Sequence, residues 1–121
     1  MASLFVENGN GKVDYYPLGK RTNVVGRDEA APIQVLDKQV SRKHVQIHFD
    51  KDRGCYFAID MKSRNGVLIN GKRIYEETEL VNGDRIHIGN TEMLFAISDF
   101  PGRKTALHHF KKVGERKFST S

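Results

Sequence analysis

Short apolar segments alternate with tight-turn signals along most of the chain, and this alternation limits the fold more than any other feature. Val45, Ile47 and Phe49 are separated by polar residues, the period-two pattern of a half-buried strand. Asn8-Gly9 and Asn70-Gly71 are typical of hairpin turns. Such segments recur about every 8–12 residues, which favours an all-β sandwich. Strands are expected at 4–6, 13–16, 22–25, 33–35, 45–49, 56–59, 67–69, 72–74, 86–88 and 93–97.

Length and composition indicate one domain followed by a tail. The chain has 121 residues, and a single hydrophobic core usually takes about 100–200. We expect the sandwich to occupy residues 1–100 and a basic C-terminal tail to occupy 101–121, because Pro101-Gly102 ends the last strand. Leu107, Phe110 and Val113 lie three residues apart in the tail. The tail is therefore expected to be a short helix or a disordered segment that docks in part on the sandwich.

Nothing in the sequence indicates secretion or membrane insertion. No apolar run approaches the roughly 20 residues that span a bilayer, so no membrane span is expected. We expect no secretory signal, because the first residues lack a basic stretch followed by a long apolar core. Cys55 is the only cysteine, which excludes an internal disulfide framework and a cysteine-based zinc cluster. A reducing compartment fits, so we expect a cytoplasmic protein, or a nuclear one in a eukaryote.

The net charge of +5 resides in the tail. Residues 1–100 contain 14 Lys or Arg and 14 Asp or Glu, whereas 101–121 contain six basic residues and one acidic residue. A nucleic-acid-binding protein usually carries basic surface on its folded part as well. We therefore expect no nucleic-acid partner, and a basic-tailed binder of nucleic acid or of an anionic surface is the alternative.

Three predicted turns carry side chains that suit an anion. Gly26-Arg27 ends one strand, Ser41-Arg42-Lys43-His44 precedes the strand at 45–49, and Ser63-Arg64-Asn65-Gly66 follows the strand at 56–59. If strands that follow one another in sequence are also neighbours in space, the three turns converge. The converging side chains would supply guanidinium, hydroxyl and amide donors with no carboxylate among them. Such a set suits an anion with several acceptor oxygens.

These segments, in this order, closely resemble the forkhead-associated (FHA) domain family. The resemblance covers about residues 4–98 and rests on Gly26-Arg27, Ser41-Arg42-x-His44, Ser63-x-Asn65-Gly66, Asn70-Gly71 and Gly83-Asp84-x-Ile86-x-Ile88-Gly89. It implies a β-sandwich of about eleven short strands that is not an enzyme and that binds phosphothreonine in partner proteins. The implied partner is a Thr-phosphorylated protein or peptide in a Ser/Thr protein kinase pathway, with no cofactor and no metal.

The resemblance also implies roles for individual residues. Arg27, Ser41 and Arg42 would hold the phosphate, and Asn65 would bind the peptide main chain. Arg64 stands where the family often has Thr or Ser, so it would contact phosphate through its backbone N–H or guanidinium, or turn into solvent. Residues expected to read the peptide three positions after the phosphothreonine are Gln39, Lys62 and Ser63. Residues expected to be structural are Gly26, His44, Gly66 and Asn70.

Two other functions compete with phosphothreonine binding. Ser41 and His44 could be a nucleophile and its base, but no Gly-x-Ser-x-Gly elbow surrounds Ser41 and no acid is placed in the sequence to orient His44. A scaffold FHA domain with a degenerate phosphate pocket is the second alternative, because Arg64 departs from the family pattern. The sequence carries no signal for the oligomeric state.

Overall fold

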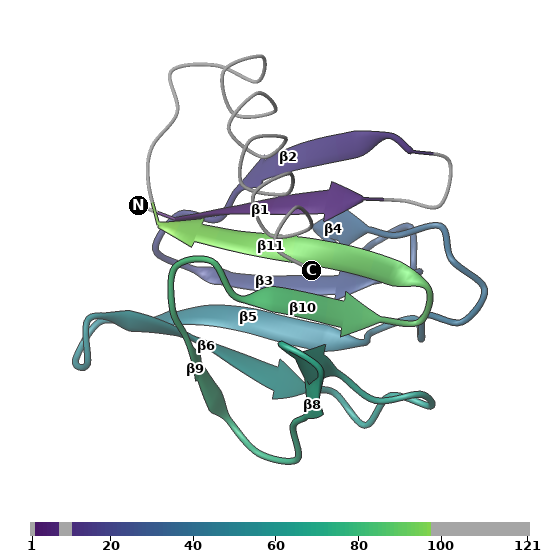
Figure 1. Cartoon of the computed structure of the whole chain (residues 1–121). Coiled ribbons are helices and arrows are strands. Elements are labelled where there is room, and N and C mark those ends of the chain that lie inside the picture. Colours follow the sequence, from purple (N-terminus) through teal and green to yellow (C-terminus); the bar gives the residue numbers. More distant parts are fainter. Residues whose placement is uncertain (1, 8–10, 98–121) are drawn as a thin grey trace, which may run out of the picture.

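Two β-sheets packed face to face make up the protein (Figure 1). The computed structural model describes residues 2–7 and 11–97. Within these ranges a six-stranded sheet has the order β2 (Val13–Pro17), β1 (Ala2–Glu7), β11 (Thr91–Ile97), β10 (Arg85–Ile88), β7 (Leu68–Ile69) and β8 (Lys72–Arg73). A five-stranded sheet has the order β4 (Ile33–Gln34), β3 (Thr22–Gly26), β5 (Val45–Asp50), β6 (Cys55–Asp60) and β9 (Thr78–Leu80). The predicted all-β sandwich of eleven strands is confirmed.

Antiparallel pairing dominates both described sheets, and the β3–β4 pair is parallel. β1 lies between β11 and β2, with Leu4 opposite Phe95 on one side and Tyr16 on the other. The hairpin turn expected at Asn8-Gly9 lies outside the described residues. The strands that it would join do pair, since Glu7 lies opposite Val13.

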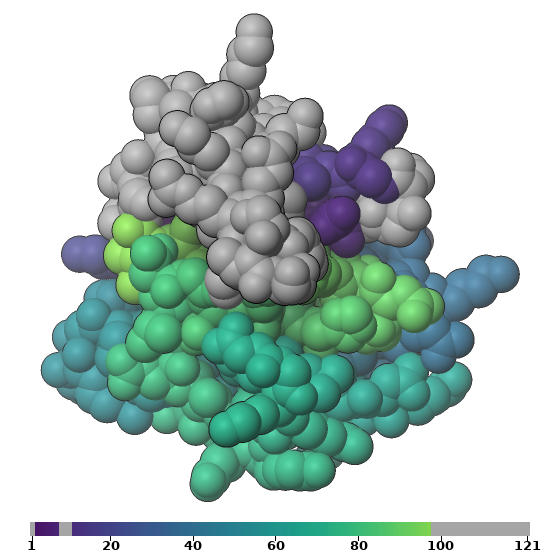
Figure 2. All heavy atoms as spheres, viewed as in Figure 1, coloured from purple at the N-terminus to yellow at the C-terminus, as the bar shows by residue number. Residues whose placement is uncertain are grey.

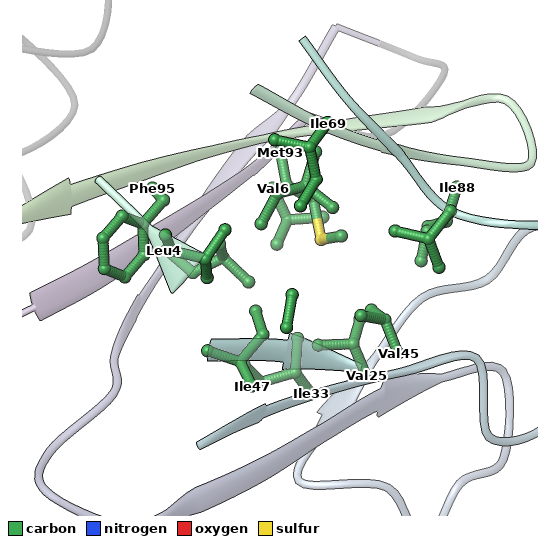
Figure 3. Close-up of a cluster of buried hydrophobic side chains, with 14 of the residues drawn as sticks. Leu4, Val6, Val25, Ile33, Val45, Ile47, Ile69, Ile88, Met93 and Phe95 are labelled. Carbon is green, nitrogen blue, oxygen red and sulfur yellow. The ribbon is translucent and has the colours of Figure 1, made fainter. Parts of the chain in front are cut away.

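The core lies between the two sheets, where their apolar inner faces meet. Figure 3 shows Leu4, Val6, Met93 and Phe95 of the six-stranded sheet pointing toward Val25, Ile33, Val45 and Ile47 of the five-stranded sheet, and all eight side chains are buried. Burial of each large aliphatic or aromatic side chain contributes about 1.5–3 kcal/mol. The alternation predicted from Val45 and Ile47 is what directs these side chains inward.

The strand boundaries differ from the predicted ones where apolar side chains reach the core from loops. Val35, Val67 and Ile74 were expected in strands, but they lie just outside β4, β7 and β8 and are still buried. Val35 N–H donates to the Gly26 carbonyl at 2.8 Å, and Ile74 N–H donates to the Val67 carbonyl at 3.0 Å. β9 was not predicted, because its three residues contain one apolar side chain and no recognisable alternation.

The expected tail at 101–121, with Leu107, Phe110 and Val113, lies outside the described residues, as does the expected domain boundary at residue 100. In the part of the chain that the structure describes, no helix has the length and apolar character needed to cross a membrane.

The loops at one end of the sandwich bring distant parts of the sequence together. The β3–β4, β4–β5 and β6–β7 loops and the β10–β11 turn all lie at the right-hand end in Figure 1. The β5–β6 turn lies at the other end. Because the sheets fix the strand ends, they also fix the distances between these loops.

Candidate functional site

A cationic cavity of about 370 Å³ opens among the clustered loops. The residues that line it are Arg27, Lys38, Gln39, Val40, Ser41, Arg42, Lys43 and Arg64. Five of these eight side chains are Lys or Arg, and no carboxylate is among the described residues of the lining. Figure 2 shows the segments around residues 40 (blue) and 65 (teal) side by side at the right-hand edge. The cavity therefore suits an anion.

The end of β3 and the segment 41–42 lie in direct backbone contact. Arg27 N–H donates to the Ser41 carbonyl at 3.0 Å, and Asp28 N–H donates to the Arg42 carbonyl at 3.2 Å. A Cβ atom on Gly26 would lie 2.0 Å from the Arg42 carbonyl oxygen, a distance that no side chain tolerates. Glycine at position 26 is what allows the two segments to come this close.

Arg27 is oriented by a hydrogen bond from its own guanidinium. Its Nε–H donates to the Val40 carbonyl at 3.0 Å. A guanidinium has five N–H donors, so this bond leaves the four on its Nη atoms to bind an anion. A fork that is already oriented loses less conformational entropy on binding than a freely rotating side chain.

Ser41 joins three segments through three different atoms. Its carbonyl accepts from Arg27, its N–H donates to His44 Nδ1 at 3.0 Å, and its Oγ accepts from the Arg64 N–H at 3.0 Å. A hydroxyl that accepts one hydrogen bond still has its own proton to donate. The Ser41 hydroxyl can thus donate to an anion in the cavity that it lines.

His44 is fully buried and connects the β4–β5 loop to the β6–β7 loop. Nδ1 accepts from the Ser41 N–H, and Nε2 lies 2.7 Å from the Gly66 carbonyl oxygen. Because an amide N–H only donates and a carbonyl only accepts, a neutral ring with its proton on Nε2 satisfies both partners. His44 contacts the Ser41 backbone rather than Oγ, so this pair does not form the arrangement that activates a nucleophile.

The β6–β7 loop is fastened by its own polar side chains. Ser63 N–H donates to Asp60 Oδ1 at 2.9 Å, and Ser63 Oγ accepts from the Gly66 N–H at 2.9 Å. Lys62 has a positive φ of 56° and an exposed side chain. Ser63 therefore holds the loop together, whereas the Lys62 side chain extends into solvent.

Asn65 joins this loop to the β4–β5 loop. Its Nδ2 donates to the Gln39 carbonyl at 2.8 Å and lies 3.2 Å from Gln39 Oε1. Both contacts use the amide nitrogen, so Oδ1 keeps its capacity to accept a hydrogen bond. A peptide N–H is a suitable donor for that oxygen.

The structure separates the predicted site residues into groups. Arg27, Gln39, Ser41, Arg42 and Arg64 line the cavity. Asn65 lies at its rim through the bonds to Gln39, whereas Lys62 and Ser63 belong to the same loop but are not among the residues lining the cavity.

Asn70 lies apart from the cavity and fastens the turn between β7 and β8 to β10. Its Nδ2 donates to Asp84 Oδ1 at 2.8 Å, and its Oδ1 accepts from the Arg85 N–H at 3.0 Å. Asn70 has a positive φ of 52°, a conformation that asparagine tolerates better than most residues. All of these contacts are made within the sandwich.

Sequence reasoning missed Asp37, which ties the β4–β5 loop to the β10–β11 turn. Oδ1 accepts from the Gln39 N–H at 2.9 Å, and Oδ2 accepts from the Asn90 N–H at 2.7 Å and the Thr91 hydroxyl at 2.8 Å. Burial raises the pKa of Asp37, but the hydrogen bonds together outweigh burial and hold this pKa below its usual value. The only local signal is the side-chain bond to residue 39, since the other partners are more than 50 residues away.

Three cationic residues of this region were also missed. Lys38 and Lys43 line the cavity, and their proximity to Ser41-Arg42 in the sequence was the available signal. Arg73 of β8 packs on the β6–β7 loop, because a Cβ on Gly66 would lie 2.6 Å from Arg73 Nε. Gly66 has a φ of +84°, so glycine is required there for the backbone conformation as well.

Within the described ranges, no group of three or more histidine, cysteine or carboxylate side chains is placed to hold a metal ion. The donors around the cavity are N–H and O–H groups. Such groups bind anions rather than cations.

Comparison with known sequences places the chain among FHA domains. A model of the FHA domain matches residues 23–89. FhaA of Mycobacterium tuberculosis, an FHA domain-containing protein, is 30% identical over 92 residues, which cover 76% of this chain and 16% of FhaA. The glycogen accumulation regulator GarA of Mycolicibacterium smegmatis is 30% identical over 94 residues, which cover 78% of this chain and 58% of GarA. The chain thus spans only part of the length of these relatives.

Solved structures agree with the sequence comparison. The FHA domain of CT664 from Chlamydia trachomatis superposes with a TM-score of 0.73 at 26% identity, covering 81% of this chain and 98% of that one. The FhaA FHA domain, solved in complex with the intracellular domain of Rv3910, gives a TM-score of 0.68 at 29% identity and covers 78% and 99%. An FHA structure from a study of phosphothreonine-dependent FHA domain interactions gives 0.69 at 27% identity, covering 82% and 98%. The chain belongs to the FHA domain family.

Proposed function

We propose that this chain is a phosphothreonine-dependent protein–protein interaction module that acts in Ser/Thr kinase signalling. The observation that carries the proposal is the cavity around the Ser41 hydroxyl. Five Lys and Arg side chains line this cavity, and none of its described lining residues is a carboxylate. A phosphothreonine carries a charge of about −1.5 to −2 and three acceptor oxygens at neutral pH. The cavity offers donors and charge of the matching kind.

Four groups would hold the phosphate. The Nη atoms of Arg27, the Ser41 hydroxyl and the guanidinium of Arg42 donate from one side, and Arg64 donates from the neighbouring loop. The Arg64 backbone N–H already bonds to Ser41 Oγ at 3.0 Å, so Arg64 would act through its guanidinium. Hydrogen bonds to a charged group contribute about 1.5–3 kcal/mol each, so three or four of them make binding depend on the phosphate.

The peptide main chain would bind beside the phosphate. Asn65 Oδ1 would accept a peptide N–H, because the Asn65 amide nitrogen is already bonded to Gln39. Positive charge surrounds the β6–β7 loop, because Lys62 and Arg64 belong to it and Arg73 of β8 packs on it. All three side chains are exposed. We therefore expect a preference for acidic residues after the phosphothreonine. Gln39 would orient Asn65, and Ser63 would hold the loop rather than read the peptide.

Solved relatives support this proposal. One related structure, EmbR of Mycobacterium tuberculosis in complex with a low-affinity phosphopeptide, gives a TM-score of 0.69 at 29% identity, covering 84% of this chain and 26% of EmbR. The buried His44, whose two nitrogens are both bonded to backbone groups, favours binding rather than catalysis. A module of this kind works where kinases and their substrates meet, so we place it in the cytoplasm.

An oriented phosphothreonine peptide library would identify a ligand, and amide-resolved NMR would then locate its binding site. Titration with the selected peptide is expected to shift the amide signals of Arg27, Ser41 and Arg64. The signal of Gly54, in the turn at the opposite end, should stay in place. Shifts confined to another surface, or identical shifts with the unphosphorylated peptide, would contradict the proposal.

A further inference from the structure

A second cavity adjoins the cationic cavity on the side of the β3–β4 loop. It has a volume of about 400 Å³ and is lined by Arg27, Asp28, Glu29, Gln34 and Arg42. Arg27 and Arg42 also line the cationic cavity, so these two residues form a shared wall. We call the second one the flanking cavity and define it by its five lining residues.

Two carboxylates distinguish the flanking cavity from the cationic one. Asp28 and Glu29 line it, whereas no carboxylate is among the described residues that line the cationic cavity. The ion pairs that the described part of the chain forms involve Asp50, Glu77 and Glu92, but neither Asp28 nor Glu29. The negative charges of Asp28 and Glu29 are therefore available to a cation from a ligand.

Asp28 is held in place, and one of its carboxylate oxygens can still accept a hydrogen bond. Its N–H donates to the Arg42 carbonyl at 3.2 Å, and its Oδ1 accepts from the Ala30 N–H at 3.0 Å. Oδ2 has no hydrogen-bond partner among the described residues. Gln34 Nε2 donates to the Arg27 carbonyl at 3.2 Å, which leaves Gln34 Oε1 as a further acceptor. Carboxylate and amide oxygens held in this way suit the ammonium of a lysine or the guanidinium of an arginine.

The strand order of the five-stranded sheet places the flanking cavity and Asn65 on opposite sides of the proposed phosphate site. β4, β3, β5 and β6 follow one another across this sheet. Asp28 and Glu29 lie in the β3–β4 loop, Ser41 lies in the segment before β5, and Asn65 lies in the loop after β6. A peptide bound through its phosphate at Ser41 and through its main chain at Asn65 would extend over the flanking cavity on the other side. Because an extended chain advances about 3.3 Å per residue, it would reach this adjoining cavity within about two or three residues.

The charges on the two sides of the phosphate site have opposite signs. Lys62, Arg64 and Arg73 surround the β6–β7 loop, whereas the flanking cavity has two carboxylates beside its two arginines. A bound phosphothreonine carries a charge of about −1.5 to −2, which would offset the charges of Arg27 and Arg42. The carboxylates then leave the flanking cavity with a net negative charge.

We infer that the flanking cavity binds a Lys or Arg side chain of the ligand, about two or three residues before the phosphothreonine. This inference rests on the proposed function, which places the residues after the phosphothreonine along the β6–β7 loop. The two sides together select a peptide that is basic before its phosphothreonine and acidic after it. A kinase that supplies this ligand must then accept a basic residue before the threonine that it phosphorylates.

Three versions of one phosphothreonine peptide test the inference on the full chain. They carry Lys, Ala or Glu at the positions two and three residues before the phosphothreonine and are otherwise identical. Fluorescence anisotropy should give an affinity about 5- to 10-fold higher for the Lys version than for the Glu version, the range expected from one or two exposed ion pairs. The Ala version should lie between them. The cationic cavity and the net charge of +5 would by themselves favour the Glu version, so the two explanations predict opposite signs.

A pair of double variants assigns the preference to the flanking cavity. Asp28→Asn with Glu29→Gln removes both charges, and the new Asn keeps an Oδ1 atom that can accept from the Ala30 N–H. The advantage of the Lys version over the Glu version should then fall below about twofold. Asp52→Asn with Glu79→Gln is the matched control, because it removes the same two kinds of charge from exposed positions in the β5–β6 turn and in β9. The control should keep the full advantage.

The outcomes separate this inference from the proposed function. Equal affinity for the three versions, or tighter binding of the Glu version, would overturn the inference and leave the proposed function standing. An advantage of the Lys version that survives Asp28→Asn with Glu29→Gln would do the same. Equal affinity for the Lys version with and without its phosphate would overturn both. The three peptides are compared on the unaltered chain, so the test stays decisive even if a variant fails to fold.

Discussion

Ser41 both connects the loops of the site and keeps a hydrogen-bond donor for the ligand. Its carbonyl, N–H and Oγ bond to Arg27, His44 and Arg64, which belong to separate parts of the chain. Because all three bonds use groups other than the hydroxyl proton, that proton remains to bind the phosphate. The residue that fastens the loops thus keeps a donor for the ligand.

Replacing Ser41 by alanine should weaken phosphopeptide binding by about 10- to 100-fold, the effect of losing one charge-assisted hydrogen bond. The melting temperature should change by only a few degrees, because the backbone bonds of residue 41 remain. Ser63→Ala is the matched control, since Ser63 Oγ accepts a bond within its own loop. Calorimetric titration checks both variants. A larger loss of affinity in Ser63→Ala than in Ser41→Ala would contradict the assignment.

Gly26→Ala should lower the free energy of unfolding by more than about 3 kcal/mol, the upper end of the usual cost of overpacking. The added methyl would meet the Arg42 carbonyl at 2.0 Å, and backbone cannot move aside as a flexible side chain can. Gly54→Ala is the control, because its Cβ meets open space and its φ of +69° costs only about 1–2 kcal/mol. Urea denaturation measures both costs. Equal costs would show that the β3 end and the segment 41–42 are not in close contact.

At the scale of elements, side-chain bonds between loops hold the site in shape. Asp37 connects the β4–β5 loop to the start of β11, and His44 connects the β4–β5 loop to the β6–β7 loop. The ends of these loops are fixed by strands. A few such bonds are therefore enough to define the cavity.

Asp37→Asn should destabilise the protein at pH 7, by about 1 kcal/mol for each hydrogen bond lost. The folded protein lowers the pKa of Asp37, so the ionised carboxylate stabilises the fold above about pH 4, and this stabilisation is lost as the pH falls through the lowered pKa. The difference in the free energy of unfolding between Asp37→Asn and the unaltered protein should therefore shrink below about pH 4. Thr91→Val, which removes one of the donors, should destabilise less. Urea denaturation at several pH values between 7 and 3 measures these free energies of unfolding. A stability difference between Asp37→Asn and the unaltered protein that does not change with pH would contradict the stabilising role of the ionised carboxylate.

The sequence predicted those elements whose signal is local. Val45, Ile47 and Phe49 alternate strictly, so β5 was predicted almost to its ends. β9 was missed because three residues cannot show a period, and its identity depends on pairing with β6. Motif order carried the resemblance to FHA domains and with it the candidate residues. The link from Asp37 to Thr91 spans 54 residues and depends on how the sheets pack, which no local pattern encodes.

At the scale of the whole molecule, the net charge of residues 1–100 does not show that cations gather around one cavity. Residues 1–100 have equal numbers of basic and acidic side chains, yet Arg27, Lys38, Arg42, Lys43 and Arg64 surround one cavity. Folding concentrates these cations because three loops meet at one end. A sum over the sequence cannot show this, since it takes no account of position in space.

Neutralising the tail should therefore leave phosphopeptide binding intact. A variant with Arg103, Lys104, Lys111 and Lys112 replaced by Gln is expected to bind within about twofold of the unaltered affinity, because the cavity retains its own cations. Fluorescence anisotropy at constant ionic strength measures the affinity. A large loss of phosphopeptide binding would instead assign the interaction to the tail.

The most direct test compares one peptide with and without phosphate on its threonine. Calorimetric titration of the full chain should give an affinity at least about 100-fold higher for the phosphorylated form, since several charge-assisted hydrogen bonds depend on the phosphate. Equal affinity for the two forms would contradict the assignment of the cavity around Arg27, Ser41 and Arg64 to a phosphothreonine.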